Sequence, residues 1–137
     1  MERSEKGFRE QEHTADLELE VWAPNLPVLL EQAAIGMYTL SGITLSNGPK
    51  QSHQVNLSAY DPESLLVGFL QELLYQAETA RVGFDRFDIH LYQYHLDASL
   101  DGAPIQSITK EIKAVTYHNL RVQEGERGLE VRIVFDV

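Results

Sequence analysis

Strict alternation of apolar and polar residues occurs near both ends of this sequence, and it constrains the fold more than any other feature. In residues 17–22, Leu17, Leu19 and Val21 alternate with two glutamates and a tryptophan. In residues 129–137, apolar residues again occupy every second position. A period of two is typical of a strand with one buried face. The sequence therefore predicts a strand near the start of the chain and another at its end.

Two helices are predicted between these strands. The first follows Asn25, a residue type that caps helix starts, and its apolar residues keep helical spacing up to the stop signal at residues 41–42. The second begins with the cap Asp61 and with Pro62, whose missing N–H costs nothing in a first turn. It should end before Gly83. Its apolar face is wide, so we expect it to be the more buried helix.

The remaining patterns predict further strands. They cover residues 53–59, 87–91 with an extension to 100, 112–117 and 120–123, with turns at 101–104 and 124–128. This order predicts a two-layer α+β domain, with one mostly antiparallel or mixed sheet of about six strands and two helices packed on it. Residues 1–11 are expected to be a polar, partly ordered N-terminal tail, and residues 12–137 a single domain.

Composition excludes several classes of protein. A chain of 137 residues with 43% hydrophobic residues fits one globular domain. Without cysteine it forms neither disulfides nor thiolate metal sites. No apolar run approaches the roughly 18 residues of a membrane span. The polar first nine residues do not resemble a signal peptide. We expect a cytoplasmic protein that does not enter a membrane.

The formal net charge of −10 comes from 21 acidic and 11 basic residues. Such a field repels a phosphate backbone, and the sequence has no basic cluster. We therefore expect no strong direct binding of nucleic acid. A cation or a basic protein partner is easier to accommodate.

The usual catalytic motifs are missing. The sequence has no P-loop, G-x-G-x-x-G, H-E-x-x-H or G-x-S-x-G. Its five histidines are scattered, with no i, i+4 pair on a predicted helix. The sequence therefore favours a protein without catalytic activity of its own.

Asp16 closes a polar stretch, residues 12–16 (EHTAD), at the entrance of the first predicted strand. Such an Asp either bonds nearby backbone amides as a turn residue or turns its carboxylate toward a ligand. At the other end, Asp136 precedes the terminal carboxylate of Val137. If the first and last strands are neighbours, these three groups supply hard oxygen donors, which favour Ca²⁺ or Mg²⁺ over Zn²⁺. The alternative is a frayed, solvated C-terminus.

Residues 109–118 are a second unusual stretch. Lys113 and Tyr117 share one face of the strand predicted at 112–117. On an open sheet face these two side chains are either solvated or in contact with an anionic group of a partner.

Together these stretches resemble the archease family. Residues 12–16 are similar to its N-terminal signature, residues 112–118 (IKAVTYH) to its second signature, and residues 135–137 (FDV) to its closing residues. The helix predicted from Asp61 also fits. The resemblance covers the chain from residue 12 to the end, and only residues 101–107 are harder to align.

The resemblance implies a role and a site. Archeases are accessory proteins of the RtcB-type RNA-splicing ligase, which joins tRNA halves and repairs RNA. They promote guanylylation of the ligase and its multiple turnover, and they are not ligases themselves. Their metal site, usually described for calcium, would consist here of Asp16, Asp136 and Val137. The polar residues of the two signatures are candidate contacts with the ligase: His13, Lys113, Tyr117 and His118.

Two other classes of function stay open at this point. An acidic cluster that holds a catalytic ion would make the protein a metal-dependent phosphoesterase, which should cleave phosphoesters alone. A general chaperone-like binding module should instead act on many clients.

Overall fold

The computed structural model describes residues 5–11 and 17–137. Its helices are α1 (Leu26–Ser41) and α2 (Pro62–Thr79). The strands in the described ranges are β1 (Gly7–Gln11), β2 (Leu17–Ala23), β3 (Thr44–Leu45), β4 (Gln51–Ser58), β5 (Val82–Tyr92), β6 (His95–Ser107), β7 (Ala114–Val115), β8 (Gln123–Gly125) and β9 (Gly128–Asp136).

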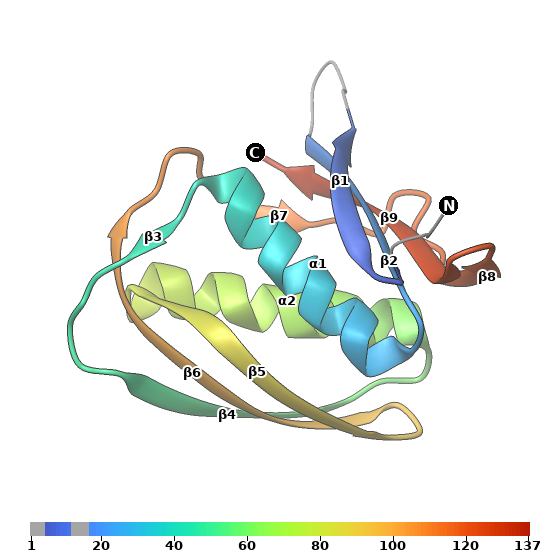
Figure 1. The fold of residues 1–137 in the computed structure, drawn as a ribbon, viewed down its shortest axis with the longest axis horizontal. Helices are drawn as coiled ribbons and strands as arrows, with labels where there is room; N and C mark the ends of the chain where they lie inside the picture. The colour runs from blue at the N-terminus through green and yellow to red at the C-terminus, as the bar shows by residue number, and fades with distance from the viewer. Residues whose placement is uncertain (1–4, 12–16) are drawn as a thin grey trace.

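The strands form two sheets. The first has the order β1-β2-β9-β7, and β8 also pairs with β9. In the second, β6 lies between β4 and β5, and β3 pairs with the last residues of β6. Every described pair is antiparallel. Figure 1 shows both helices in the middle of the molecule, and each helix contacts strands of both sheets.

Both helix starts follow the expected cap chemistry. The side chain of Asn25 accepts a hydrogen bond from the Val28 N–H at 3.0 Å, and that of Asp61 accepts one from the Ser64 N–H at 2.7 Å. Gly42 ends α1 in the left-handed conformation, with φ at 63°, which glycine adopts without steric cost. Local sequence therefore sets where each helix begins and where α1 ends.

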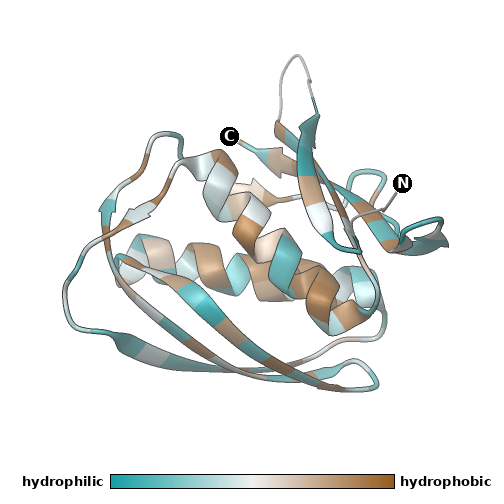
Figure 2. Cartoon of the chain, viewed as in Figure 1, coloured by the Kyte–Doolittle hydropathy of each residue, from teal (hydrophilic) through white to brown (hydrophobic). Residues whose placement is uncertain are grey.

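The core lies between the helices and the inner faces of the sheets. Figure 2 shows apolar residues gathered on the helices and alternating with polar ones along the strands. Large side chains with no exposed surface come from every layer, and they include Leu19, Met37, Leu66, Phe69, Leu100 and Phe135. Burying such a side chain contributes about 1.5–3 kcal/mol. No helix in the described part of the chain is both long and apolar enough to cross a membrane.

The α+β class and the two helices are confirmed, but the predicted single sheet of about six strands is not what forms. The described residues make nine strands in two sheets. The predicted strand from 87 toward 100 is in fact a hairpin that turns after Tyr92, where Gln93 has a φ of 54°. No glycine or proline marks that turn in the sequence.

The turn predicted at residues 101–104 lies inside β6. Gly102 sits opposite Phe84 and Gln51, and a Cβ atom there would collide with the backbone of Gly83. The glycine is therefore needed because two strands approach closely, a role that sequence alone does not distinguish from a turn.

Residues 7–11, which the sequence placed in the polar tail, instead form β1 against β2. Phe8 is partly buried against the core and lies over Gly36 of α1, where an added Cβ would come within 3.0 Å of the Phe8 ring. One inward aromatic residue and the pairing with β2 therefore hold a segment whose other residues are polar.

The strand predicted at 112–117 is much shorter than expected, and the one predicted at 120–123 lies further along the chain and shares only Gln123 with the prediction. Only Ala114–Val115 and Gln123–Gly125 are strands, and both pair with β9. Side chains of α2 supply partners for part of the intervening backbone, as described below.

Candidate functional site

Three segments that are distant in the sequence meet at the end of the first sheet where β9 finishes. We call this end of the sheet its C-terminal edge. Phe135 of β9 has Leu17 as its partner on β2 and Val115 as its partner on β7. Asp136 is opposite Ala114. Because the Phe135 side chain has no exposed surface, the strands are fixed to each other beneath this edge. The prediction that the first and last strands pair is confirmed.

The second signature is held along β9 by its backbone. The Lys113 N–H donates to the Asp136 carbonyl at 2.8 Å, and the Thr116 N–H donates to the Val134 carbonyl at 3.0 Å. On the other side, the Val115 N–H donates to the side-chain oxygen of Gln71 in α2 at 2.7 Å. Sequence reasoning missed Gln71, because a polar residue on an amphipathic helix gives no sign of such a contact.

The loop after this segment is fixed by α2 as well. The Val122 N–H donates to the Glu63 carboxylate at 2.7 Å, and the His118 N–H donates to the Thr116 hydroxyl at 3.3 Å. Asn119 has a φ of 51°, and its side-chain Nδ2 lies 3.3 Å from Nε2 of His118. Tyr117 is 59% exposed. The loop therefore presents polar side chains on a backbone that is held in place.

The structure places five of the seven predicted site residues at this edge or in the adjoining loop. These five residues, all with exposed side chains, are Lys113, Tyr117, His118, Asp136 and Val137. His13 and Asp16 lie outside the described residues. Leu17, the residue after Asp16, is placed by its pairing with Phe135.

The residues present at this edge fit a hard cation. Asp136 and Val137 are consecutive and exposed, and Asp136 carries a side-chain carboxylate. Oxygen donors of this kind suit Ca²⁺ and Mg²⁺. Within residues 5–11 and 17–137, no three His, Cys, Asp or Glu side chains gather as a metal-binding group. That range does not contain Asp16, the third predicted ligand.

Lys113 also borders a cavity of about 260 Å³ between the end of α2 and the loop before β7. Lys110 and Arg81 line the same cavity, together with Glu78 and Glu111. The positive side chains are thus accompanied by carboxylates, and the cavity is not a uniformly basic pocket.

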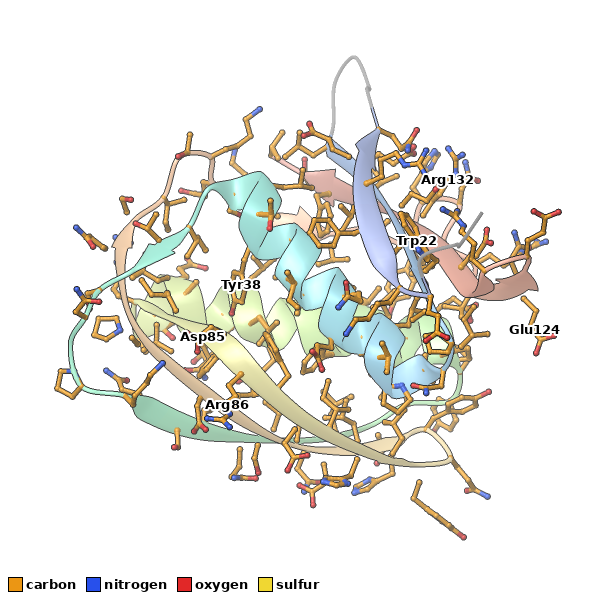
Figure 3. The ribbon with its side chains drawn as sticks, in the orientation of Figure 1. Trp22, Tyr38, Asp85, Arg86, Glu124 and Arg132 are labelled. Carbon is orange, nitrogen blue, oxygen red and sulfur yellow. The ribbon has the colours of Figure 1, made fainter. Side chains whose placement is uncertain are left out.

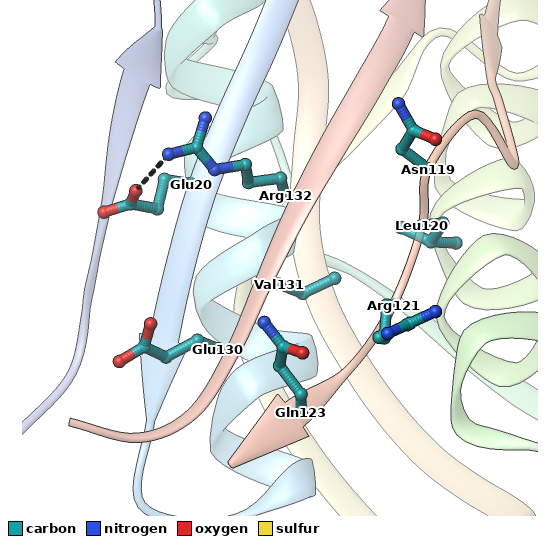
Figure 4. Close-up of a pocket in the computed structure, with 8 residues that line it drawn as sticks. All are labelled: Glu20, Asn119, Leu120, Arg121, Gln123, Glu130, Val131 and Arg132. Carbon is teal, nitrogen blue, oxygen red and sulfur yellow. Dashed lines mark ion pairs between the residues drawn. The ribbon is translucent and has the colours of Figure 1, made fainter. Parts of the chain in front are cut away.

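A second charged group, on the outer face of the first sheet, was not predicted. Glu20 accepts a hydrogen bond from Arg127 at 2.8 Å and forms ion pairs at 3.5 Å with Arg9 and Arg132. Figure 4 shows the ion pair of Glu20 with Arg132 at the rim of a pocket of about 510 Å³. Arg127 is 107 residues from Glu20 in the sequence, so no local pattern could reveal this contact.

Electrostatics and stacking both stabilise this outer-face group. The hydrogen bond from Arg127 is the main cause that lowers the pKa of Glu20, and it raises the pKa of Arg127 in turn. The guanidinium of Arg127 stacks on the Trp22 ring, 4.0 Å from its centroid. Trp22 lies over β1 where Gly7 has no side chain, and it is labelled in Figure 3. Because each of these charges is paired within the fold, we interpret the group as stabilising the sheet rather than as a binding site.

Comparison with known proteins decides the family. Residues 8–137 match the model of the Archease protein family (MTH1598/TM1083). This chain belongs to the archease family. It is 30% identical to protein archease of Methanosarcina mazei over 141 residues, covering 96% of this chain and 97% of that protein. It is 28% identical to protein archease of Saccharolobus islandicus, covering 96% and 99%.

A solved structure supports the same fold. The solution structure of Methanobacterium thermoautotrophicum protein 1598 matches this archease with a TM-score of 0.69 and 21% sequence identity. The match covers 96% of this chain and 99% of that one. The family resemblance drawn from the three signatures is therefore confirmed, and so is the α+β class.

Proposed function

We propose that this archease is a non-catalytic activator of an RtcB-type RNA-splicing ligase in the cytoplasm. It promotes guanylylation of the ligase and its multiple turnover in tRNA splicing and RNA repair. One observation carries the proposal. The strand after the first signature, the second signature and the closing residues meet around Phe135 at one edge of a sheet. Segments that are far apart in the sequence, such as those around Leu17 and Phe135, therefore contribute to a single surface that a partner can contact.

The polar groups on that surface support contact with another protein. Lys113, Tyr117 and His118 are exposed on a segment whose backbone is fixed by β9 and α2. A backbone that is already fixed loses little conformational entropy when a partner binds. The net charge of −10 favours encounter with a basic, RNA-handling enzyme. In this proposal RNA contacts the ligase rather than the archease, because the same charge repels phosphate.

A divalent cation, Ca²⁺ or Mg²⁺, belongs to the same proposal. Asp16, Asp136 and the terminal carboxylate of Val137 would hold it. When bound, it supplies positive charge that offsets the repulsion between neighbouring carboxylates. Asp136 and Val137 are exposed at the end of β9, and the Lys113 N–H fixes the Asp136 carbonyl at 2.8 Å. The chain's own residues thereby orient the donor segment.

The test is an assay of the cognate ligase with and without this protein. We expect faster guanylylation and continued ligation beyond the first turnover, and no ligation or nucleotidyl transfer by the archease alone. Parallel incubation of the archease with phosphoester substrates and divalent metal addresses the phosphoesterase alternative. Unchanged guanylylation and ligation rates at saturating archease would refute the proposal. Activation of unrelated enzymes to the same extent would favour a general chaperone instead.

A further inference from the structure

One edge of the second sheet is unpaired along its whole length. β4 pairs with β6 on one side, and no other strand of residues 5–11 and 17–137 pairs with its opposite edge. The Ala59 N–H donates to the Tyr94 carbonyl at 3.0 Å, which continues the register that pairs Ser58 with His95. Because bonding directions alternate along an antiparallel strand, odd-numbered residues bond to β6. The outward N–H and C=O groups belong to Ser52, Gln54, Asn56 and Ser58.

The two outer strands of this sheet differ in how their edges are protected. Exposed edges are usually blocked by charges, prolines or bulges. β5 has a bulge between Phe84 and Arg86 and carries the charged residues Asp85 and Asp88; Figure 3 labels two of these side chains, Asp85 and Arg86. The hydroxyl of Tyr38 also accepts the Phe84 N–H at 3.2 Å. β4 contains no Lys, Arg, Asp, Glu or Pro, and its register with β6 is unbroken.

A groove of about 610 Å³ follows the unpaired edge of β4. Its opposite wall is α2, which contributes Ser64, Gly68 and Glu72. These residues are four apart and therefore lie on one face of the helix. Two of them are small, so the wall leaves room beside the strand for the side chains of another strand.

Gly68 has no requirement in the fold that would explain it. A Cβ atom there would meet only the Leu57 side chain, at 3.5 and 3.9 Å, which is ordinary contact. Glycine inside a helix is less stable than alanine by about 1 kcal/mol. The missing side chain does keep the groove open at its middle. Gly68 is thus a second observation, independent of the unpaired strand, that indicates an occupant.

We propose that this groove, lined by β4 and the Ser64–Gly68–Glu72 face of α2, binds an extended basic segment of a partner protein. The segment adds to the sheet as a further strand, through the outward groups of β4. Small or β-branched side chains face Gly68. The proposal does not depend on the ligase role and uses a surface distinct from the C-terminal edge.

Charge and aromatic surface define the partner. Glu72 lies in the groove wall, and its Oε2 accepts a hydrogen bond from Gln76 at 2.9 Å and lies 3.1 Å from the ring of His53. Both contacts are to one oxygen, so the carboxylate can still meet a Lys or Arg of the segment. Tyr60, at the other end of the groove, is fully exposed, and exposed tyrosines are frequent anchors in interfaces. A second copy of the chain would bring another net charge of −10, which opposes self-pairing. A basic segment is the complementary occupant.

The experiment selects ligands from a random dodecapeptide library displayed on phage, using the full chain as bait. We expect enrichment of sequences that alternate small or β-branched residues with polar ones and carry Lys or Arg. The selected peptide is then synthesised and its affinity measured by fluorescence anisotropy. Gly68→Leu fills the groove and should weaken binding at least about tenfold, a difference of 1.4 kcal/mol. Gly68→Ala, the matched control, should stay within about twofold of the parent.

Hydrogen exchange with the same peptide locates the site. The amides of Ser52, Gln54, Asn56 and Ser58 should become protected. If Gly68→Leu does not fold, Asn56→Pro decides, because it removes one outward N–H at an edge position that tolerates proline. Equal binding by the parent and the blocked variants, protection elsewhere, or no enriched sequence would overturn the proposal. So would a dimer in sedimentation whose β4 amides are already protected, since a second copy would then be the occupant.

Discussion

The first sheet carries two groups of charged residues that are arranged in opposite ways. On its outer face, Glu20 lies among three arginines, and its shortest contact, to Arg127, is 2.8 Å. Its side chain is only 14% exposed. At the C-terminal edge, Lys113 and Asp136 are exposed, and no ion pair joins either side chain to another described residue. One group is satisfied within the fold, and the other can still bind a ligand or partner.

This difference predicts that stability and the proposed function are separable on one sheet. Charge-assisted hydrogen bonds between partly buried groups stabilise the strands that they join. Exposed charges at the end of a strand contribute little to folding, so their substitution should leave the fold intact. The predictions below test this division, and they are ordered by their expected effect on the free energy of unfolding.

Phe135→Ala should have the largest effect, because this buried residue lies between Leu17 and Val115 and supports the edge from below. A large cavity in a core costs about 3–5 kcal/mol, a large part of a typical domain's stability of about 5–15 kcal/mol. Urea denaturation measures the loss. Phe135→Leu, the matched control, should lose less than about 1.5 kcal/mol. A loss below about 1 kcal/mol for Phe135→Ala would show that the strands are held at this edge by other contacts.

Glu20→Gln should have an intermediate effect. The substitution keeps the shape of the side chain and removes the charge that pairs with Arg127, Arg9 and Arg132. Hydrogen bonds to charged groups contribute about 1.5–3 kcal/mol, and we expect a loss of about 1–2 kcal/mol by urea denaturation. Glu124→Gln, on the exposed strand β8 of the same sheet, is the control and should change stability by less than about 0.5 kcal/mol. Equal losses of stability for the two substitutions would show that the paired charges around Glu20 stabilise the fold no more than an exposed charge does.

The same group gives stability a defined dependence on pH. The pKa of Glu20 is lowered in the fold from its ordinary value of 4.5, chiefly by the hydrogen bond from Arg127. Its contribution is therefore fully present above pH 4.5 and is lost as the pH falls through the lower, folded-state pKa. The stability difference between the parent and Glu20→Gln should be constant near neutral pH and shrink below pH 4.5. A difference that grows on acidification would have the wrong sign.

Local sequence predicted the parts of this fold that depend on neighbours in the chain. The caps at Asn25 and Asp61, the stop at Gly42 and the strand β9 follow from short patterns. The turn at Gln93 could not be predicted, because a residue without turn preference adopts a positive φ within a hairpin. Separation into two sheets likewise depends on long-range packing rather than on periodicity.

The same limit applies to the candidate site. The signatures and the last two residues led to the prediction of Lys113 and Asp136 as site residues, and the alternating pattern led to the pairing of β2 with β9. Gln71 fixes the second signature from α2, and Glu63 fixes the loop after it. Neither has a local signal, because each accepts a hydrogen bond from a backbone N–H far away in sequence. Glu20 and Arg127 are 107 residues apart for the same reason.

Asp136→Asn should have the smallest effect on stability and a large effect on function. Asp136 is exposed at the end of β9, so thermal melts should give an unfolding free energy within about 0.5 kcal/mol of the parent. A neutral amide oxygen is a poorer donor to a hard cation than a carboxylate, so calorimetric titration with Ca²⁺ and Mg²⁺ should show weaker binding. We expect ligase guanylylation to fall at least about tenfold, or 1.4 kcal/mol in the barrier. Asp88→Asn, an exposed Asp on the second sheet, is the control for loss of one surface charge. Parent-like metal binding and activation by Asp136→Asn would refute the assignment, whereas lost metal binding with full activation would separate the metal from the activation of the ligase.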